Sequence, residues 1–472
     1  MAWHTLIEVS RKAGPSLTAQ IQGTLRREIT EAVLLPGTRL PSSRQLSEDL
    51  GVSRSVVVEA YGQLMAEGYL EATPGSGTRV AARPTAASPP PTLLREDPAP
   101  PVRWDLRTGT AGLPSFPQRE WLTCYQNAVR AASRRDLGYP SPSGVPELRA
   151  ELAGYLGRVH GVHTTPEQVV VVSGFAHALG LVCAVLPELG IDALGMEDPC
   201  HLRQRQFVRE TGLRPHAVPV DGDGIDVAAL YRSGLRAVLV TPAHQFPTGA
   251  ALTAERRESL ARWARDVDGW VIEDDYDGDL WLARGVRIPA LQRLLPERTL
   301  YGGTASKSLA PGLRLGWLAV PRRLLAPLER VRSRRDLGSD VLTQLALAEL
   351  MRSGLFDRHL RAQRAHLRGR RESLELAVQR FLPGTRILGT AMGLHAYLRL
   401  PDHVDEARLV AAALRRSVLV QGGRPFHHRP RPDAPALVLG YSNLPRSAVT
   451  EVLRTLGEAC AEQPAGRRRS CA

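Results

Sequence analysis

The spacing of apolar residues divides the first eighty residues into helices followed by a hairpin. Apolar side chains recur every four positions from Ile21 to Ile29, which is typical of one face of an amphipathic helix. Ser42 and Ser53 stand where helix N-caps are expected, and each predicts a further helix that ends at a glycine. Within 69–80, two short strand patterns flank the turn sequence Pro-Gly-Ser-Gly, which predicts a β-hairpin.

From residue 103 onward, short apolar runs alternate with helical patterns. The runs that predict strands are 169–172, 193–197, 236–240, 269–273 and 299–301. Continuous apolar strands separated by helices indicate a mostly parallel sheet that is covered on both faces. In such sheets ligands bind beyond the carboxyl ends of the strands. Strand patterns at 393–400 and 437–441 predict a smaller α+β lobe.

The composition changes between these two regions. Seven prolines and few core-forming residues fall within 81–102, which predicts a semi-rigid linker that could span up to about 70 Å when extended. We therefore divide the chain into an N-terminal domain at 1–82, a linker at 83–102, a large domain at 103–462 and a basic, disordered tail at 463–472.

Composition and charge favour a cytoplasmic protein without a membrane segment. No signal peptide is evident, no stretch approaches the roughly 18 apolar residues of a membrane span, and the five cysteines form no CxxC pair. The net charge is +13, but residues 1–82 carry eight basic and eight acidic side chains. The excess lies in 321–381, with 14 arginines against seven acids, which is typical of solvated helix surfaces. Bulk charge therefore does not locate a nucleic-acid-binding face.

One residue is chemically distinctive in this arginine-rich chain. Of the 61 basic residues only Lys12 and Lys307 are lysines. Arginine replaces lysine in ion pairs and phosphate contacts, but its guanidinium keeps its proton and cannot condense with an aldehyde. Lys307 is therefore a candidate covalent amine, and a surface lysine that survives by chance is the alternative.

Two further strings follow predicted strands. Ser-Gly-Phe-Ala at 173–176 opens a helix, whose free N–H groups suit a phosphate. The string 274–279 reads Asp-Asp-Tyr-Asp-Gly-Asp, but its glycine falls at the wrong place for a calcium loop, and we expect no metal. Together with Lys307, these strings supply the amine, carboxylate, hydroxyl and phosphate cup that pyridoxal 5'-phosphate (PLP) requires.

In this order and spacing, the strings resemble the MocR/GabR subfamily of GntR transcriptional regulators. Residues 36–54 resemble a GntR winged helix-turn-helix, which is mostly α. Residues 241–249, 273–277 and 303–307 resemble the subfamily's α/β fold-type I aminotransferase-like domain, which carries a smaller α+β lobe. The resemblance covers nearly the whole chain. It implies PLP as cofactor, a double-stranded DNA operator as partner, a small-molecule effector and a head-to-tail homodimer.

The resemblance also implies roles for individual residues. Lys307 would form the Schiff base with PLP, Asp274 would hold the ring nitrogen protonated, and Tyr276 would donate to the phenolic oxygen. Arg314 would contact the phosphate, and Tyr139 would reach the phosphate of the neighbouring subunit. The remaining cofactor-binding residues implied are Ser173, Gly174, Phe175 and Thr304 at the phosphate and His201 on the ring face.

The chain departs from the subfamily pattern near the effector. His201 replaces the usual stacking tyrosine, and Arg203 fits a position that holds an effector's carboxylate in some members. A second carboxylate arginine is absent from 437–440, which argues against a GABA-like amino acid. Phe246 stands where a true aminotransferase has an asparagine beside the phenolic oxygen, which argues against efficient transamination.

DNA contacts are expected at the starts of the second and third helices and at the hairpin, called the wing. The residues implied are Arg44, Ser53, Arg54, Ser55, Gly77 and Thr78.

We interpret the chain as a PLP-dependent regulator that senses PLP or the external aldimine of an amino compound. If PLP itself is the ligand, we expect the protein to control genes of vitamin B6 metabolism. The alternatives are an active aminotransferase with an accessory DNA-binding domain and a PLP-free scaffold.

Overall fold

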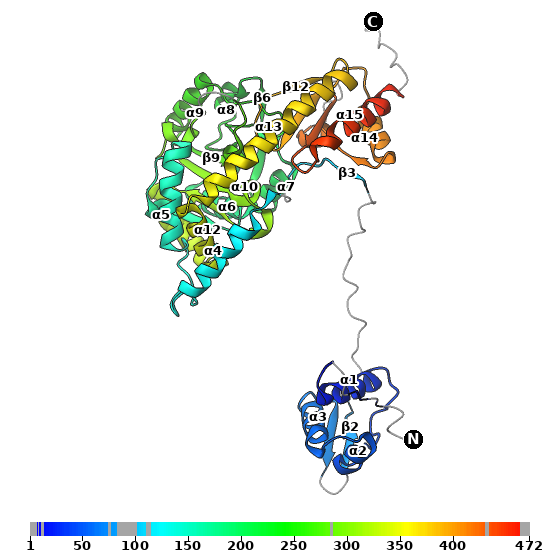
Figure 1. The fold of residues 1–472 in the computed structure, drawn as a ribbon. Coiled ribbons are helices and arrows are strands. Elements are labelled where there is room, and N and C mark those ends of the chain that lie inside the picture. Colours follow the sequence, from blue (N-terminus) through cyan, green and yellow to red (C-terminus); the bar gives the residue numbers. More distant parts are fainter. Residues whose placement is uncertain are drawn as a thin grey trace. The chain divides into compact units, whose positions relative to one another are not determined.

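The computed structural model describes residues 7, 9–10, 14–73, 77–82, 102–109, 115–283, 287–429 and 434–462. The chain forms two compact units, 1–98 and 99–472 (Figure 1). Apart from residue 102, the predicted linker lies outside the described residues, and so does the predicted tail. Within the described part of the chain, no helix is long and apolar enough to cross a membrane.

The smaller unit has the predicted helices and hairpin. Its elements are α1 (Leu17–Thr30), α2 (Ser43–Leu50), α3 (Arg54–Ala66), β1 (Leu70–Thr73) and β2 (Gly77–Val80). The Ser42 hydroxyl caps α2 by accepting from Gln45 N at 3.2 Å, as predicted. Ser53 occupies the N-cap position of α3 but makes no capping bond, because its Oγ pairs with Ser55 Oγ at 2.9 Å.

Helices α1 and α2 pack on α3 through fully buried leucines. Leu25, Leu46 and Leu64 contribute one side chain from each helix. The Tyr61 hydroxyl donates to Pro41 O at 3.1 Å and ties α3 to the segment that precedes α2. The antiparallel strands β1 and β2 complete this small core with Leu70 and Val80.

The larger unit is built on a mixed sheet that, in the described residues, has the order β4-β11-β10-β9-β8-β5-β6-β7. Its strands are β4 (Val169–Val172), β5 (Ala193–Asp198), β6 (Arg214–Asp221), β7 (Gly224–Ile225), β8 (Ala237–Val240), β9 (Trp270–Asp275), β10 (Thr299–Thr304) and β11 (Gly316–Ala319). Neighbouring pairs from β6 to β10 are parallel, which confirms the prediction of a mostly parallel sheet. The antiparallel pairings of β11 and β7 were not predicted.

Helices cover both faces of this sheet. They are α4 (Gln118–Ala131), α5 (Pro146–Tyr155), α6 (Phe175–Val185), α7 (Leu202–Glu210), α8 (Val227–Arg232), α9 (Ala254–Asp266), α10 (Ala305–Ser308), α11 (Arg322–Arg335) and α12 (Val341–Arg352). Side chains of a strand point alternately to opposite faces. Val170 and Val172 accordingly pack with α6 and α11, whereas Val169 and Val171 pack with α5 and α12.

The smaller lobe has an antiparallel sheet of order β12-β13-β16-β15. Its elements are β12 (Arg386–Leu388), β13 (His395–Arg399), α14 (Glu406–Arg415), β14 (Val418–Leu419), β15 (Gln421–Gly422), β16 (Ala436–Gly440) and α15 (Arg446–Ala461). The first strand of the unit, β3 (Trp104–Asp105), pairs in parallel with β14, so the segment after the linker joins this lobe.

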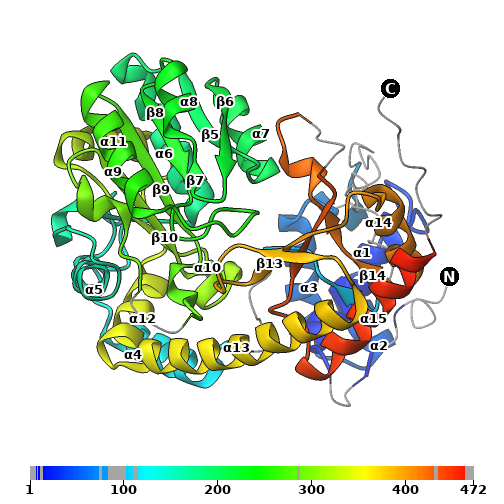
Figure 2. The same cartoon turned by 90° about the horizontal axis from the view of Figure 1, so that it is seen from above.

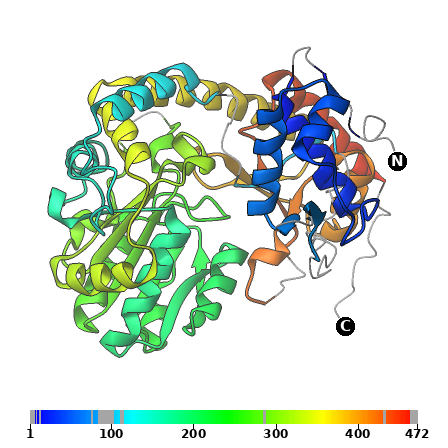
Figure 3. The same cartoon turned by 90° about the horizontal axis from the view of Figure 1, so that it is seen from below.

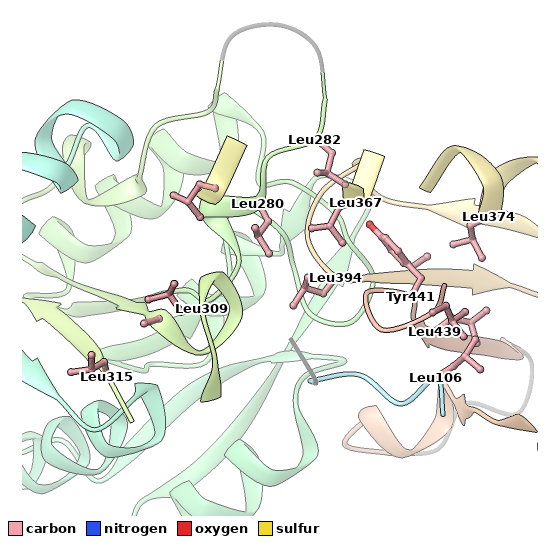
Figure 4. Close-up of a cluster of buried hydrophobic side chains, with 14 of the residues drawn as sticks. Leu106, Leu280, Leu282, Leu309, Leu315, Leu367, Leu374, Leu394, Leu439 and Tyr441 are labelled. Atoms are coloured by element: carbon pink, nitrogen blue, oxygen red, sulfur yellow. The ribbon is translucent and has the colours of Figure 1, made fainter. Parts of the chain in front are cut away.

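One long helix, α13 (Leu355–Phe381), joins the two lobes (Figure 2). Figure 3 shows α4 beside it, and Arg358 of α13 pairs with Glu120 of α4 at 3.1 Å. The buried core is continuous from one lobe to the other (Figure 4). In this core, Leu280 and Leu394 lie between two groups of side chains. The large lobe supplies one group, and Leu106 and Tyr441 of the small lobe belong to the other.

A glycine in β10 makes room for the start of α6. A Cβ on Gly302 would lie 2.5 Å from Cε2 of Phe175. We expect Gly302→Ala to displace Phe175 and destabilise the large unit by about 1–3 kcal/mol, measured as a lower melting temperature. The matched control is Gly222→Ala, since a Cβ there has no heavy atom within 4 Å. Equal melting temperatures for the two variants would contradict the packing argument.

Candidate functional site

A cavity of about 420 Å³ lies at the carboxyl ends of β9 and β10. This is where ligands bind in parallel sheets. The predicted residues that line it are Gly174, Phe175, His201, Arg203, Asp274, Tyr276, Thr304, Lys307 and Arg314. Ser173 and Tyr139 do not line it. The fold therefore brings together most of the residues implied by the resemblance, from elements far apart in the sequence.

Lys307 is held by the short helix α10, which follows β10 directly. The Thr304 hydroxyl caps the N-terminus of this helix by accepting a hydrogen bond from Ser306 N at 3.1 Å. The Lys307 ammonium group donates to Gly109 O at 2.6 Å. Burial lowers the pKa of Lys307, although the carboxylates of Asp277 and Asp274 oppose that shift. A lowered pKa raises the fraction of neutral amine, which is the nucleophilic form.

The Asp274 carboxylate lines the cavity, and only one of its two oxygens has a hydrogen-bond partner among the described residues. Its Oδ2 accepts from Gln204 Nε2 at 2.8 Å, whereas Oδ1 is buried and has no hydrogen-bond partner among the described residues. Burial raises the pKa of Asp274 to about 8, and the nearby Asp275 and Asp277 add to the shift. A buried acceptor without a partner is costly, so this oxygen suits a ligand that presents a positively charged N–H. Gln204 was not predicted, because its position on α7 carries no sequence signal.

The opposite end of the cavity suits an anion. Gly174, at φ 99°, precedes α6, and Phe175 lies in the first turn of this helix, where amide groups have no partner within the helix. The Arg314 guanidinium packs on Gly174, 3.5 Å from the place where a Cβ would lie. Helix N-terminus and guanidinium thus converge, as a phosphate requires.

Ser173, which the resemblance implies at the phosphate, does not line the cavity. Its backbone N–H donates to His177 Nδ1 at 3.0 Å, and His177 in turn pairs with Asp336 at 2.7 Å. This amide is therefore already satisfied within the protein, which leaves Gly174, Phe175 and Arg314 as the candidates for binding an anion.

Aromatic rings form another wall. His201 and Phe246 line the cavity with ring centroids 5.2 Å apart. Burial, together with the charges of Lys307 and Arg203, lowers the pKa of His201 to about 4, so its imidazole is neutral at physiological pH. A neutral imidazole presents a flat face on which a planar ring can stack. Arg203 brings a positive charge to the same wall.

Tyr139 lies on the surface, 89% exposed. Three other apolar side chains of this region are also exposed: Leu122 and Val129 on α4, and Leu137. Tyr139 therefore does not contribute to the cavity of its own chain.

In the smaller unit, the predicted DNA-contacting residues lie on the surface. The Arg44 side chain is 81% exposed, and Arg54 is exposed and donates to Ser43 Oγ at 3.3 Å. Gly77, at φ 86°, starts β2, and Thr78 follows it. Arg39 was not predicted, yet its guanidinium lies 3.3 Å from the place of a Gly77 Cβ and brings a positive charge to the wing.

Comparison with known proteins assigns the two compact units to two different families. Residues 17–80 match the gntR family of bacterial regulatory proteins, and residues 111–455 match aminotransferase class I and II. The probable rhizopine catabolism regulatory protein MocR of Rhizobium meliloti is 31% identical over 475 residues, covering 96% of each chain. The HTH-type pyridoxine biosynthesis transcriptional regulator PdxR of Corynebacterium glutamicum is 35% identical, covering 81% of this chain and 83% of the relative.

Solved structures share the fold of the larger unit. Kynurenine aminotransferase of Pyrococcus horikoshii aligns with a TM-score of 0.70 at 24% identity, covering 77% of this chain and 91% of that one. An α-aminoadipate aminotransferase of Thermus thermophilus, in complex with N-(5'-phosphopyridoxyl)-L-leucine, aligns with a TM-score of 0.69 at 26% identity. The alignment covers 77% of this chain and 92% of that one.

Proposed function

The chain belongs to the MocR/GabR subfamily of GntR transcriptional regulators, and we propose that it controls transcription by sensing PLP, or an amino compound joined to PLP, in its larger unit. The observation that carries the proposal is the buried Oδ1 of Asp274, which has no partner among the described residues and belongs to the same cavity as Lys307. A carboxylate and a primary amine in one enclosed site match the two ends of a pyridoxal ring.

The residues present fit PLP. Bound PLP supplies an aldehyde that condenses with primary amines and a ring that withdraws electrons. Lys307 would hold it covalently, Asp274 would pair with the ring nitrogen, and Gly174, Phe175 and Arg314 would hold the phosphate. The remaining proposed contacts are Tyr276 at the phenolic oxygen, His201 on the ring face and Thr304 near the phosphate.

We propose PLP as the primary ligand. β16 (Ala436–Gly440) carries no arginine, which leaves Arg203 as the proposed carboxylate anchor. The absence of a second arginine argues against a GABA-like amino acid as the effector. The similarity to a pyridoxine biosynthesis regulator is consistent with a role in vitamin B6 metabolism. Phe246, which lines the cavity without any polar atom to donate, argues against transamination as the main activity.

The segment that follows the linker supports a path from this site toward the DNA-binding unit. Leu106 N donates to Leu419 O at 2.8 Å, and Thr108 N donates to Gln421 Oε1 at 3.0 Å. Further along this segment, the Gly109 carbonyl accepts from Lys307. An ammonium group has three N–H donors, and covalent attachment to PLP leaves one at most. Because at most one N–H then remains for the Gly109 carbonyl and any other acceptor, we propose that cofactor binding weakens this contact and loosens the segment attached to the linker.

We further propose a homodimer that presents two winged helices to a double-stranded operator, with Tyr139 completing the partner's site. The exposed tyrosine and the exposed apolar side chains of Leu122, Val129 and Leu137 support this arrangement. A symmetric dimer would read two half-sites.

Lys307 should be the site of covalent attachment. We expect Lys307→Ala to remain folded but to lose the visible absorbance of bound PLP, because no other side chain of the cavity is a primary amine. Lys12→Ala, the matched lysine control, should keep the absorbance. Borohydride reduction followed by peptide mapping provides the direct measurement. A label on Lys12 would contradict the assignment.

PLP should loosen the segment that begins at residue 102. In hydrogen exchange followed by mass spectrometry, we expect the 103–109 amides of the wild type to exchange faster once PLP is bound, because Gly109 loses its contact. Lys307→Ala lacks the donor, so its exchange should be fast with or without PLP. Unchanged wild-type exchange would refute the proposed path.

DNA binding should depend on a few placed arginines in the smaller unit. Arg54→Ala should weaken binding to the protein's own upstream region by about 1–3 kcal/mol if Arg54 reads a base. Arg361→Ala, an exposed arginine of α13, serves as the control and should bind normally. Gel-shift titration measures both. Loss of binding in the α13 variant with intact binding in Arg54→Ala would contradict the assignment.

A further inference from the structure

His244, Asp277 and His395 form a buried cluster beside Tyr276, and His395 itself lines the cavity. Each residue is at most 3% exposed. His244 belongs to the string 241–249 and Asp277 to the string 274–279, yet neither has a role in the proposed cofactor site. The side chains of His244 and Asp277 are hydrogen-bonded to each other, and the His244 ring also contacts Tyr276.

The hydrogen bonds of this cluster fix where the protons lie. His244 Nδ1 lies 2.7 Å from Asp277 Oδ2 and 3.1 Å from the Tyr276 hydroxyl oxygen. A carboxylate at the shorter distance places the proton on Nδ1, which then cannot accept a hydrogen bond. The Tyr276 hydroxyl therefore cannot donate to the ring and donates instead to His244 O at 3.0 Å. A ligand oxygen would have to draw that hydrogen away from the His244 carbonyl.

Close packing holds the cluster in place. A Cβ on Gly393 would collide with Asp277 Oδ2, and a Cβ on Gly249 would lie 3.1 Å from His244 Nε2. The Tyr441 hydroxyl donates to Gly393 O at 2.8 Å and fixes that backbone. The imidazole and the carboxylate thus have little freedom to leave their hydrogen bond.

The same three side chains form a donor set that metals accept, since their ligand atoms lie within 4.8 Å of one another. However, His395 Nε2 donates to Pro247 O at 3.1 Å, and His244 Nδ1 shares its proton with Asp277. A metal would have to displace the His244 proton. The hydrogen-bonded arrangement therefore favours a positioning role.

We propose that His244, oriented by Asp277, is a positioning residue that keeps the Tyr276 hydroxyl available as a donor to the phenolic oxygen of the cofactor. The proposal rests on the proposed binding of PLP. The proposal also gives His244 a role in this chain. The Phe246 side chain, which lines the cavity, has no polar group that could donate to the phenolic oxygen.

The test is the pH titration of the visible absorbance of the PLP-loaded full-length protein. Removing a donor to the phenolic oxygen destabilises its anionic form, so the cofactor retains its proton to higher pH. We expect Tyr276→Phe to raise the titration midpoint by about one pH unit. His244→Leu should shift it in the same direction by at least half as much. His244→Asn, whose amide N–H can replace Nδ1–H, should restore most of the wild-type midpoint.

A double-mutant cycle isolates the path through Tyr276. In the Tyr276→Phe background, His244→Leu should cause no further shift, because the hydroxyl that it orients is gone. Other titratable groups that face this set are Asp274, Asp275, Glu197, Lys307, Arg371, His395 and Tyr441. They are the same in both backgrounds, so the cycle cancels their contribution.

Three outcomes would overturn the proposal: equal shifts by His244→Leu in both backgrounds, no shift in either, or one zinc ion per chain in the purified protein. If His244→Leu does not fold, Asp277→Asn tests the same relay, because a neutral amide no longer holds the proton on Nδ1. Its shift should likewise vanish in the Tyr276→Phe background. If the wild type shows no absorbance with PLP, the proposed function itself fails, which is distinguishable from failure of the relay.

Discussion

The parallel pairing of β9 with β10 is the constraint on which the site depends. Their register places Asp274 opposite Gly302 and Asp275 opposite Gly303, so both strands end at the same edge of the sheet. Asp274 then points into the cavity, and α10 begins directly after β10 and carries Lys307 to it. Since Gly302 also leaves room for Phe175, one strand pair positions the amine, the carboxylate and the start of the anion-binding helix.

The aspartates of the string 274–279 have different surroundings in the structure. Asp274 faces the cavity, Asp277 pairs with His244, and Asp275 and Asp279 flank His160 at 3.0 and 2.9 Å. The hydrogen bonds of His160 hold the pKa values of both flanking carboxyl groups low despite their burial, with that of Asp279 at about 2. Buried charges are tolerated only when they are paired in this way. These pairs hold the end of β9 rigid beneath the cavity.

The sequence allowed local features to be predicted better than long-range ones. The helices of the small unit and the parallel strands follow from periodicity, whereas the shared site of Lys307, Asp274 and Tyr276 was implied by the resemblance to the regulator subfamily. The antiparallel strand β11 was missed, because pairing direction is decided by distant parts of the chain. Gln204 and the partner of the Ser173 amide were missed for a related reason, since each contact joins side chains that only the tertiary fold brings together.

Thermodynamic linkage sets a requirement on any path from the cofactor site to DNA. If PLP binding changes operator affinity by some factor, operator binding must change PLP affinity by the same factor. The path through Gly109 can carry such coupling only if the hydrogen bond between Gly109 and Lys307 differs in free energy between the PLP-free and the PLP-bound protein. A hydrogen bond to a charged donor contributes about 1.5–3 kcal/mol, which bounds the coupling at roughly 10- to 150-fold. That range is sufficient for a transcriptional switch, so one exchanged hydrogen bond of Lys307 could supply the whole effect.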